Sequence, residues 1–200
     1  MASNGMSAII FLPITNISKH VLKLNLINFV LFQIGWFACV ISAAAGMPWI
    51  GVLIGVIIVC LHIWRATEPT AELSLVAISI VIGALWDSIL VWQEWLSYTS
   101  GYLLENTAPI WIITLWALFA TTLNISLRWL KNFPFFAILL GGVAGPLAYL
   151  AGVKLGAVSF SNTTEALIIL AMGWALITPL LLKLAIHYDG YQLDTSRLGS

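Results

Sequence analysis

The stretch "GALWDSILVWQEWL", residues 83–96, places two carboxylates inside an otherwise apolar run. An aspartate that faced lipid in its charged form would cost about 3 kcal/mol on insertion scales. We therefore expect Asp87 to face a cavity inside a helix bundle. Helical residues that follow one another at steps of three or four share a face. The face that bears Asp87 holds Ser79, Gly83, Asp87, Leu90 and Glu94.

Two chemistries fit a carboxyl group at position 87. It is either a proton-handling or ligand-binding group, or a protonated acid that donates one structural hydrogen bond. Burial disfavours the charged form of a carboxyl group, and no basic residue is expected at the same depth, so we predict that Asp87 is largely neutral. Glu94 is expected near the outer surface, in contact with water. The sequence identifies no catalytic residue.

A second helical stripe lies in the run 108–130 and consists of small and polar residues. Small residues allow membrane helices to approach closely, and this packing is enough to explain the first three members of the stripe. Asn124 needs hydrogen-bond partners inside the bundle, and Arg128 is close enough to the membrane surface to reach it. The stripe comprises Thr114, Ala117, Thr121, Asn124 and Arg128.

Two further layers follow from depth along the expected helices. Asn28 and Gln33 lie within ~6 to ~14 Å of the cytoplasmic end, close to Asn124 in depth. Buried amides need partners, so these three are expected to form one connected inner layer. That layer either joins helices or binds a head group or small polar ligand. An outer layer, at the depth of Asp87, comprises Trp36, Asp87, Tyr149 and Trp174.

Metal and cofactor chemistry finds little support in the sequence. His62 and His187 are expected near the cytoplasmic ends of helices, where histidines are usually solvated, so a haem between them is disfavoured. No zinc-ligand spacing, phosphate-binding loop or nucleophile elbow occurs. We expect no metal and no cofactor. Cys39 and Cys60 are expected at different depths and therefore as free thiols.

The composition of the chain indicates that it lies in a lipid bilayer. Of its 200 residues, 61% are hydrophobic and only 8% are charged, whereas soluble domains have about a quarter charged residues. Zero net charge excludes a basic surface for nucleic acid. The expected fold is all-α, a polytopic membrane bundle. Its six transmembrane helices are predicted at 24–45, 49–65, 72–96, 108–130, 134–153 and 165–186.

The basic residues predict the orientation of these six spans. Seven lie on the side of the termini and only Lys154 lies on the other side, so both termini are expected in the cytoplasm. Residues 1–23 then form a short cytoplasmic or interfacial segment, 24–186 the membrane domain and 187–200 a cytoplasmic tail. The seven are Lys19, Lys23, Arg65, Arg128, Lys131, Lys183 and Arg197.

Four stretches, in this order and spacing, resemble a family of small bacterial inner-membrane proteins classed only as a domain of unknown function. They are "NFVLFQIGWFACV", "LWDSILV", "APIWIITLWALFATTLNISLRWL" and "GGVAGPLAYLAGVKLGAV". The resemblance covers about residues 24–186. It implies a multi-span architecture, a bacterial inner-membrane location and a connection with lipid biology, but no activity.

Three classes of function remain open. The first is a protein that binds or moves a lipid-like or amphipathic molecule in an intramembrane cavity near Asp87. The second is an accessory or assembly subunit of a lipid-modifying system, with a protein partner or a second copy of the chain. The third is a membrane enzyme that acts on lipid with Asp87 as acid or base. The candidate ligand-binding residues are Asn28, Gln33, Trp36, Asp87, Asn124, Tyr149 and Trp174.

Overall fold

The computed structural model describes residues 14–191, and the side chains of residues 21–191. Within this range the chain forms six α-helices, one 3-10 helix (η1) and one two-stranded sheet. In chain order the elements are α1 (Ile14–Ala44), α2 (Pro48–Arg65), α3 (Pro69–Trp92), β1 (Leu96–Tyr98), α4 (Ile110–Leu123), η1 (Arg128–Asn132), α5 (Pro134–Lys154), β2 (Val158–Phe160) and α6 (Thr163–His187).

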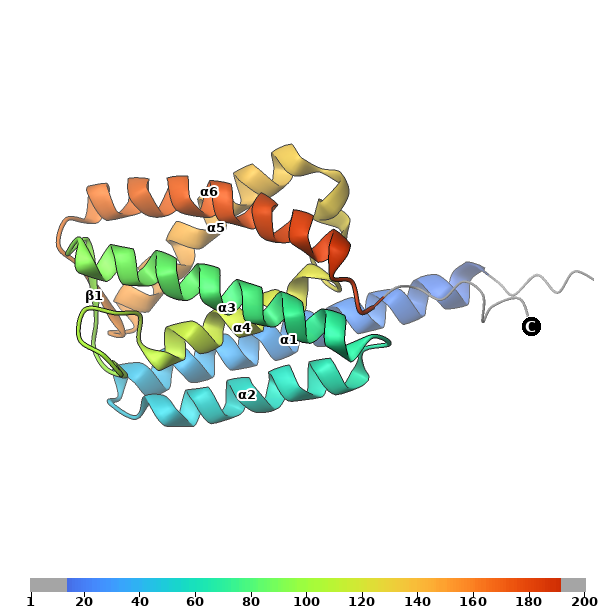
Figure 1. Cartoon of the computed structure of the whole chain (residues 1–200), viewed down its shortest axis with the longest axis horizontal. Coiled ribbons are helices and arrows are strands. Elements are labelled where there is room, and N and C mark those ends of the chain that lie inside the picture. Colours follow the sequence, from blue (N-terminus) through green and yellow to red (C-terminus); the bar gives the residue numbers. More distant parts are fainter. Residues whose placement is uncertain (1–13, 192–200) are drawn as a thin grey trace, which may run out of the picture.

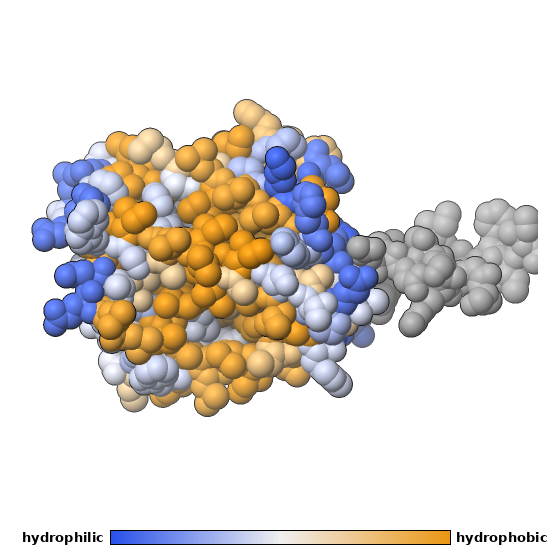
Figure 2. Space-filling view, viewed as in Figure 1, coloured by the Kyte–Doolittle hydropathy of each residue, from blue (hydrophilic) through white to orange (hydrophobic). Residues whose placement is uncertain are grey.

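Five of these helices are long and apolar enough to cross a membrane, the apolar part of α1 being Val21–Ala44. Their exposed side chains are mostly large and hydrophobic, and Figure 2 shows a broad apolar surface between two more hydrophilic ends. A bilayer can satisfy such a surface, whereas water cannot. The chain is thus a multi-pass helical membrane protein.

The helices form two groups (Figure 1). α1 packs against α2 and α4, and α4 also packs against α2 and α3, whereas α5 packs mainly against α6. The pair α5–α6 meets the remaining helices through α3 and α4. The two-stranded sheet lies at one end of the bundle, and η1 lies at the other, where α1 begins and α6 ends.

The fourth helix is shorter than the predicted span 108–130. α4 has 14 residues and ends at Leu123, so it extends for only ~21 Å at 1.5 Å per residue. Asn124 caps it, and the Asn124 side chain donates to Glu72 and to the carbonyl of Tyr188. Beyond this cap the chain turns into η1.

The third helix also ends earlier than predicted, at Trp92 rather than at residue 96. Glu94 adopts a positive φ of 57°, and the amide of Trp95 bonds to the carbonyl of Leu90. This is a Schellman-type helix end, which usually contains glycine. Glu94 is exposed, as expected, but it leaves the buried face of α3. The chain then forms β1, which pairs with β2 in antiparallel fashion, an element that an all-α prediction did not include.

Close packing between α3 and α4 brings Trp116 next to the buried residue Asp87. A Cβ atom on Gly83 would lie 2.0 Å from the ring of Trp116, so glycine is the residue that lets this ring approach α3. Small residues allow the same close approach between membrane helices in general. The Trp116 indole is thereby brought beside Asp87, one turn further along α3.

Candidate functional site

Asp87 lies at the centre of a buried cluster of aromatic hydrogen-bond donors. The side chain is 0% exposed. Its Oδ1 atom accepts from the hydroxyl groups of Tyr98 at 2.5 Å and Tyr149 at 2.6 Å. Its Oδ2 atom accepts from Trp116 Nε1 at 2.6 Å. We call these four residues the Asp87 cluster. Three donors compensate the desolvation of the carboxyl group.

Each donor of the Asp87 cluster comes from a different element. Tyr98 ends β1, and β2 holds that strand through the pair Tyr98–Val158. Trp116 belongs to α4 and Tyr149 to α5. Burial raises the pKa of Tyr98 well above its usual range, so this phenol keeps its proton and can donate. The carboxyl group therefore joins α3, α4, α5 and the sheet at one point.

A cleft runs along the membrane-facing side of the bundle between α1 and α5, with α4 and α6 beneath it. We call it the lateral cleft. Its wide part, toward η1, has a volume of about 540 Å³ and is lined by Phe29, Phe37, Leu147 and other apolar side chains. These three residues are exposed at its rim, so the cleft opens sideways onto the apolar surface.

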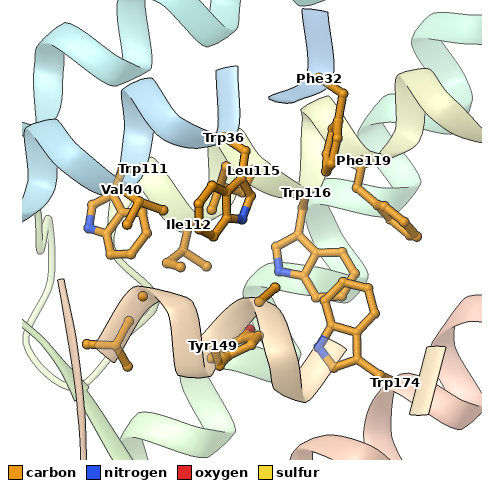
Figure 3. A pocket seen from close by; sticks show the side chains of 13 residues that line it. Phe32, Trp36, Val40, Trp111, Ile112, Leu115, Trp116, Phe119, Tyr149 and Trp174 are labelled. Atoms are coloured by element: carbon orange, nitrogen blue, oxygen red, sulfur yellow. The ribbon is translucent and has the colours of Figure 1, made fainter. Parts of the chain in front are cut away.

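A narrow part of about 90 Å³ continues the lateral cleft toward the sheet. Figure 3 shows its aromatic side chains, with Trp116 and Trp174 lying face to face. These two rings are stacked with their centroids 4.8 Å apart and an interplanar angle of 9°. Both parts of the cleft share Phe32, Trp36 and Trp174.

Four of the seven predicted site residues line the lateral cleft. Tyr149 lines the narrow part, Gln33 lines the wide part, and Trp36 and Trp174 line both. Asp87 is not among the residues that line either part of this cleft. It contacts the cleft through Tyr149 and Trp116, two lining residues that donate to it.

The predicted inner layer of amides is divided between different surroundings. Asn28 donates to the carbonyl of Thr121 at 3.0 Å and accepts from the Ser126 hydroxyl at 2.7 Å. Asn124 instead bonds to Glu72 at 2.6 Å. Gln33 is partly exposed in the cleft. These three amides make no direct hydrogen bond to one another in the described part of the chain, because helix rotation aims amides of equal depth in different directions.

A second buried carboxylate, Glu72, was missed by the sequence analysis. It is 0% exposed, and one oxygen lies 2.7 Å from His62 Nε2. The other accepts from Asn124 Nδ2 and from the backbone amide of Gly190. We call Glu72, His62, Asn124 and Gly190 the Glu72 cluster. His62 is buried, so the expectation that it is solvated is wrong.

Ion pairs of Asp189 lie at the same end of the molecule as the Glu72 cluster. Asp189 accepts from Arg128 at 2.7 Å and from Lys131 at 2.9 Å. Burial lowers the pKa of Lys131, and hydrogen bonding to Asp189 opposes that shift. Tyr191 donates to the carbonyl of His62 at 2.5 Å. Together these bonds hold segment 188–191 across the ends of α2, α3 and η1.

The helical face of α3 contained a signal for the Glu72 cluster. Steps of three or four extend the face of Asp87 back through Ser79 and Val76 to Glu72, and all of these residues are buried. Glu72 lies in the first turn of α3 after Pro69, where an acidic residue is common and favourable without any buried partner. Tertiary contacts with His62, Asn124 and Gly190 bury it.

The cysteines and the remaining candidate metal ligands form no further site among residues 21–191. Cys39 and Cys60 are free thiols, as predicted. Among residues 21–191 no three metal-ligating side chains are grouped as a metal site would require. His187 is exposed at the end of α6.

Comparisons with known proteins identify a family. The model of a family described as "Protein of unknown function (DUF2878)" matches residues 25–180. This range contains the Asp87 cluster and the residues of the lateral cleft, while Asp189 and Tyr191 lie beyond it. The searches of curated proteins and of solved structures give no match.

Proposed function

Because the chain belongs to the DUF2878 family of proteins of unknown function, we propose a function from its own geometry: it binds a lipid-like molecule in the lateral cleft. The observation that supports this proposal is an apolar cleft of about 540 Å³ that opens onto the membrane-facing surface between α1 and α5. Ligand sites of this size are usually concave and mostly apolar, with a few polar groups that orient the ligand.

The polar groups of the cleft fit this role. Gln33 supplies an amide on α1, and Tyr149 supplies a phenol whose ring lines the narrow part. Flat aromatic side chains offer large apolar contact areas at a small entropic cost. A lipid chain would enter sideways from the bilayer, past Phe37 and Leu147, without crossing a hydrophilic end of the bundle.

Asp87 acts in this proposal as a positioning residue. Its two oxygens hold Trp116 and Tyr149, which line the narrow part of the cleft. A side chain packed by several fixed partners loses little freedom when a ligand binds, and such preorganisation increases affinity. The carboxyl group thus shapes the binding site without touching the lipid.

The bacterial inner membrane, with both termini in the cytoplasm, is the proposed setting. The seven-to-one distribution of basic residues supports it. A reporter that is active only in the cytoplasm, fused after Leu193, is expected to be active. Activity of a periplasm-only reporter at the same position would overturn this orientation.

Native mass spectrometry of protein purified from its host membrane tests the proposal. We expect a retained lipid on the wild-type chain. Ala144 lines the wide part of the cleft and is exposed, so Ala144→Trp should fill the cleft and remove that lipid. Val143 is its neighbour, exposed to 52% and not among the lining residues, so Val143→Trp is the matched control.

Three results are informative. Loss of the lipid in Ala144→Trp but not in Val143→Trp supports the cleft. Equal retention by both variants places the lipid elsewhere and contradicts the proposal. A retained polypeptide in place of a lipid would favour an accessory subunit instead.

A further inference from the structure

The polarity of the lateral cleft restricts the kind of lipid that fits it. Its lining includes Gln33, Thr122, Ser126 and Thr178, but no acidic or basic side chain occurs among the lining residues that belong to the described part of the chain. A charged head group inside the cleft would therefore lose its water without gaining a counter-ion. Such a burial costs several kcal/mol.

Gln33 lies at the middle of the membrane-spanning part of α1. The apolar stretch of this helix is Val21–Ala44, so Gln33 lies ~17 Å from either end at 1.5 Å per residue. Charges at this depth are the most costly in a bilayer. A head group that reaches Gln33 must therefore be uncharged.

Two cationic groups near the wide end of the cleft, on Arg128 and Lys131, already have partners. Arg128 and Lys131 both bond to Asp189. Lys131 also donates to Asn124 Oδ1 and to the carbonyl of Ala185. These two cations are thus engaged within the protein and are not available to the phosphate of a phospholipid.

Most hydroxyl groups in the cleft are also engaged. Thr122 donates to the carbonyl of Phe119 and Ser126 donates to Asn28. The Thr178 hydroxyl is buried without a partner in residues 21–191, on the floor of the cleft. The side-chain amide of Gln33 makes no hydrogen bond to any residue that the structure describes, although it is only partly exposed. Gln33 can donate to one ligand oxygen and accept from another.

We propose that the ligand of the lateral cleft is an uncharged lipid whose head group carries hydroxyl or ester oxygens, bound through the Gln33 amide. This inference rests on the proposed function, because it names the class of lipid that the cleft takes. The acyl chains of such a lipid lie along the aromatic side chains, and its oxygens meet the amide at mid-membrane depth. Diacylglycerol represents this class, and phosphatidylglycerol has the same chains with an anionic head.

A competition experiment tests the inference. Full-length protein, stripped of lipid in detergent, is mixed with equal amounts of dioleoylglycerol and dioleoylphosphatidylglycerol, and the bound lipid is measured by native mass spectrometry. The wild-type chain is expected to retain the diacylglycerol at least about 10-fold better. Gln33→Met keeps the size of the side chain but removes the amide, and it should lower diacylglycerol retention roughly 5-fold, as expected for one hydrogen bond.

Two controls separate folding from binding. Asn25→Met changes an amide on the same helix that is not among the lining residues, and it should bind diacylglycerol like the wild type. Ala144→Trp should remove both lipids. Thermal unfolding of all variants identifies any that fail to fold. If Gln33→Met fails to fold, Gln33→Glu replaces it, and the charge of the glutamate should abolish retention of the neutral lipid.

The outcomes distinguish this inference from the proposed function. Preferred retention of phosphatidylglycerol, or no effect of changing Gln33, overturns the neutral-lipid inference while loss of binding in Ala144→Trp still supports the cleft. Unchanged binding in Ala144→Trp, or retention of neither lipid, overturns both.

Discussion

Asp87 and Glu72 share one face of α3, ~22 Å apart along the helix axis, and both carboxyl groups are 0% exposed. Their partners differ in kind. Asp87 is held by two phenols and an indole, all neutral donors, from β1, α4 and α5. Glu72 is held by a histidine, an asparagine and a backbone amide, beside the ion pairs of Asp189.

This difference indicates two separate tasks. Two donors of the Asp87 cluster, Trp116 and Tyr149, also line the lateral cleft, so that cluster sets the shape of the proposed binding site. In the Glu72 cluster the carboxylate accepts from the backbone amide of Gly190, so the cluster fastens segment 188–191 to the bundle. Burial of a carboxylate is therefore not by itself a mark of a functional site, and the function of its partners has to be considered.

Removal of the Glu72 carboxylate should have the largest effect on stability. Glu72→Leu leaves His62, Asn124 and the amide of Gly190 without their acceptor in a dry site, and we expect a loss of about 3 kcal/mol or more. Reversible unfolding in mixed detergent micelles measures it. Glu68→Leu, at an exposed carboxylate one turn earlier, should stay within about 0.5 kcal/mol. Equal losses for the two variants would contradict the fastening role.

Polar and apolar substitutions at Asp87 should lower the stability of the protein by different amounts. Asp87→Leu leaves three buried donors unpaired and should cost about 2–3 kcal/mol. In Asp87→Asn the amide oxygen can accept from Trp116 while a phenol accepts from the amide nitrogen, so the loss should be about 1 kcal/mol. The asparagine variant should also keep the lipid of the cleft.

The same two variants distinguish a positioning role of Asp87 from a direct role in proton transfer or ligand binding. A fully stable Asp87→Asn that loses lipid or activity in the host would show that the carboxyl group handles a proton or a ligand directly. That result would contradict the positioning role, which requires Asn to work and Leu to fail.

Tyr191 should give the smallest effect, visible at high pH. Burial raises its pKa to about 12, from an ordinary value of 10.0. The unfolded chain therefore loses this proton first, and stability from this group is complete below pH 10 and is lost as pH rises toward 12. Tyr191→Phe should remove that part of the pH dependence in an unfolding titration, with a loss of about 1 kcal/mol at neutral pH. If Tyr191→Phe leaves the pH dependence of stability above pH 10 unchanged, the raised pKa of Tyr191 in the folded chain would be contradicted.

Apolar runs were sufficient to predict the helices, because turn residues such as Pro48 and Pro69 interrupt them clearly. They were not sufficient to predict where α3 and α4 end. Glu94 replaces the usual glycine in a left-handed cap, and Asn124, which caps α4, bonds to residues 52 and 64 positions away. Such partners are invisible to a local pattern.

Depth along the helices predicted part of the candidate site. The equal depth of Asp87 and Tyr149 led to a pair that the structure bonds directly, and Trp36 and Trp174 do meet in one cleft. Tyr98 was missed because it belongs to a loop strand that pairs with residues about 60 positions later. Depth could not predict that Gln33 faces the cleft while Asn124 bonds to Glu72, because depth says nothing about helix rotation.

The most direct test of the lipid-binding cleft is photocrosslinking in native membranes. A benzophenone side chain replaces Leu147, which is exposed in the cleft lining, or Leu139, which is exposed on the same helix and is not among the lining residues. After irradiation, mass spectrometry identifies the adducts. A defined lipid enriched at position 147 over position 139 is the predicted result. The same mixture of bulk lipids at both positions would contradict a specific lipid site between α1 and α5.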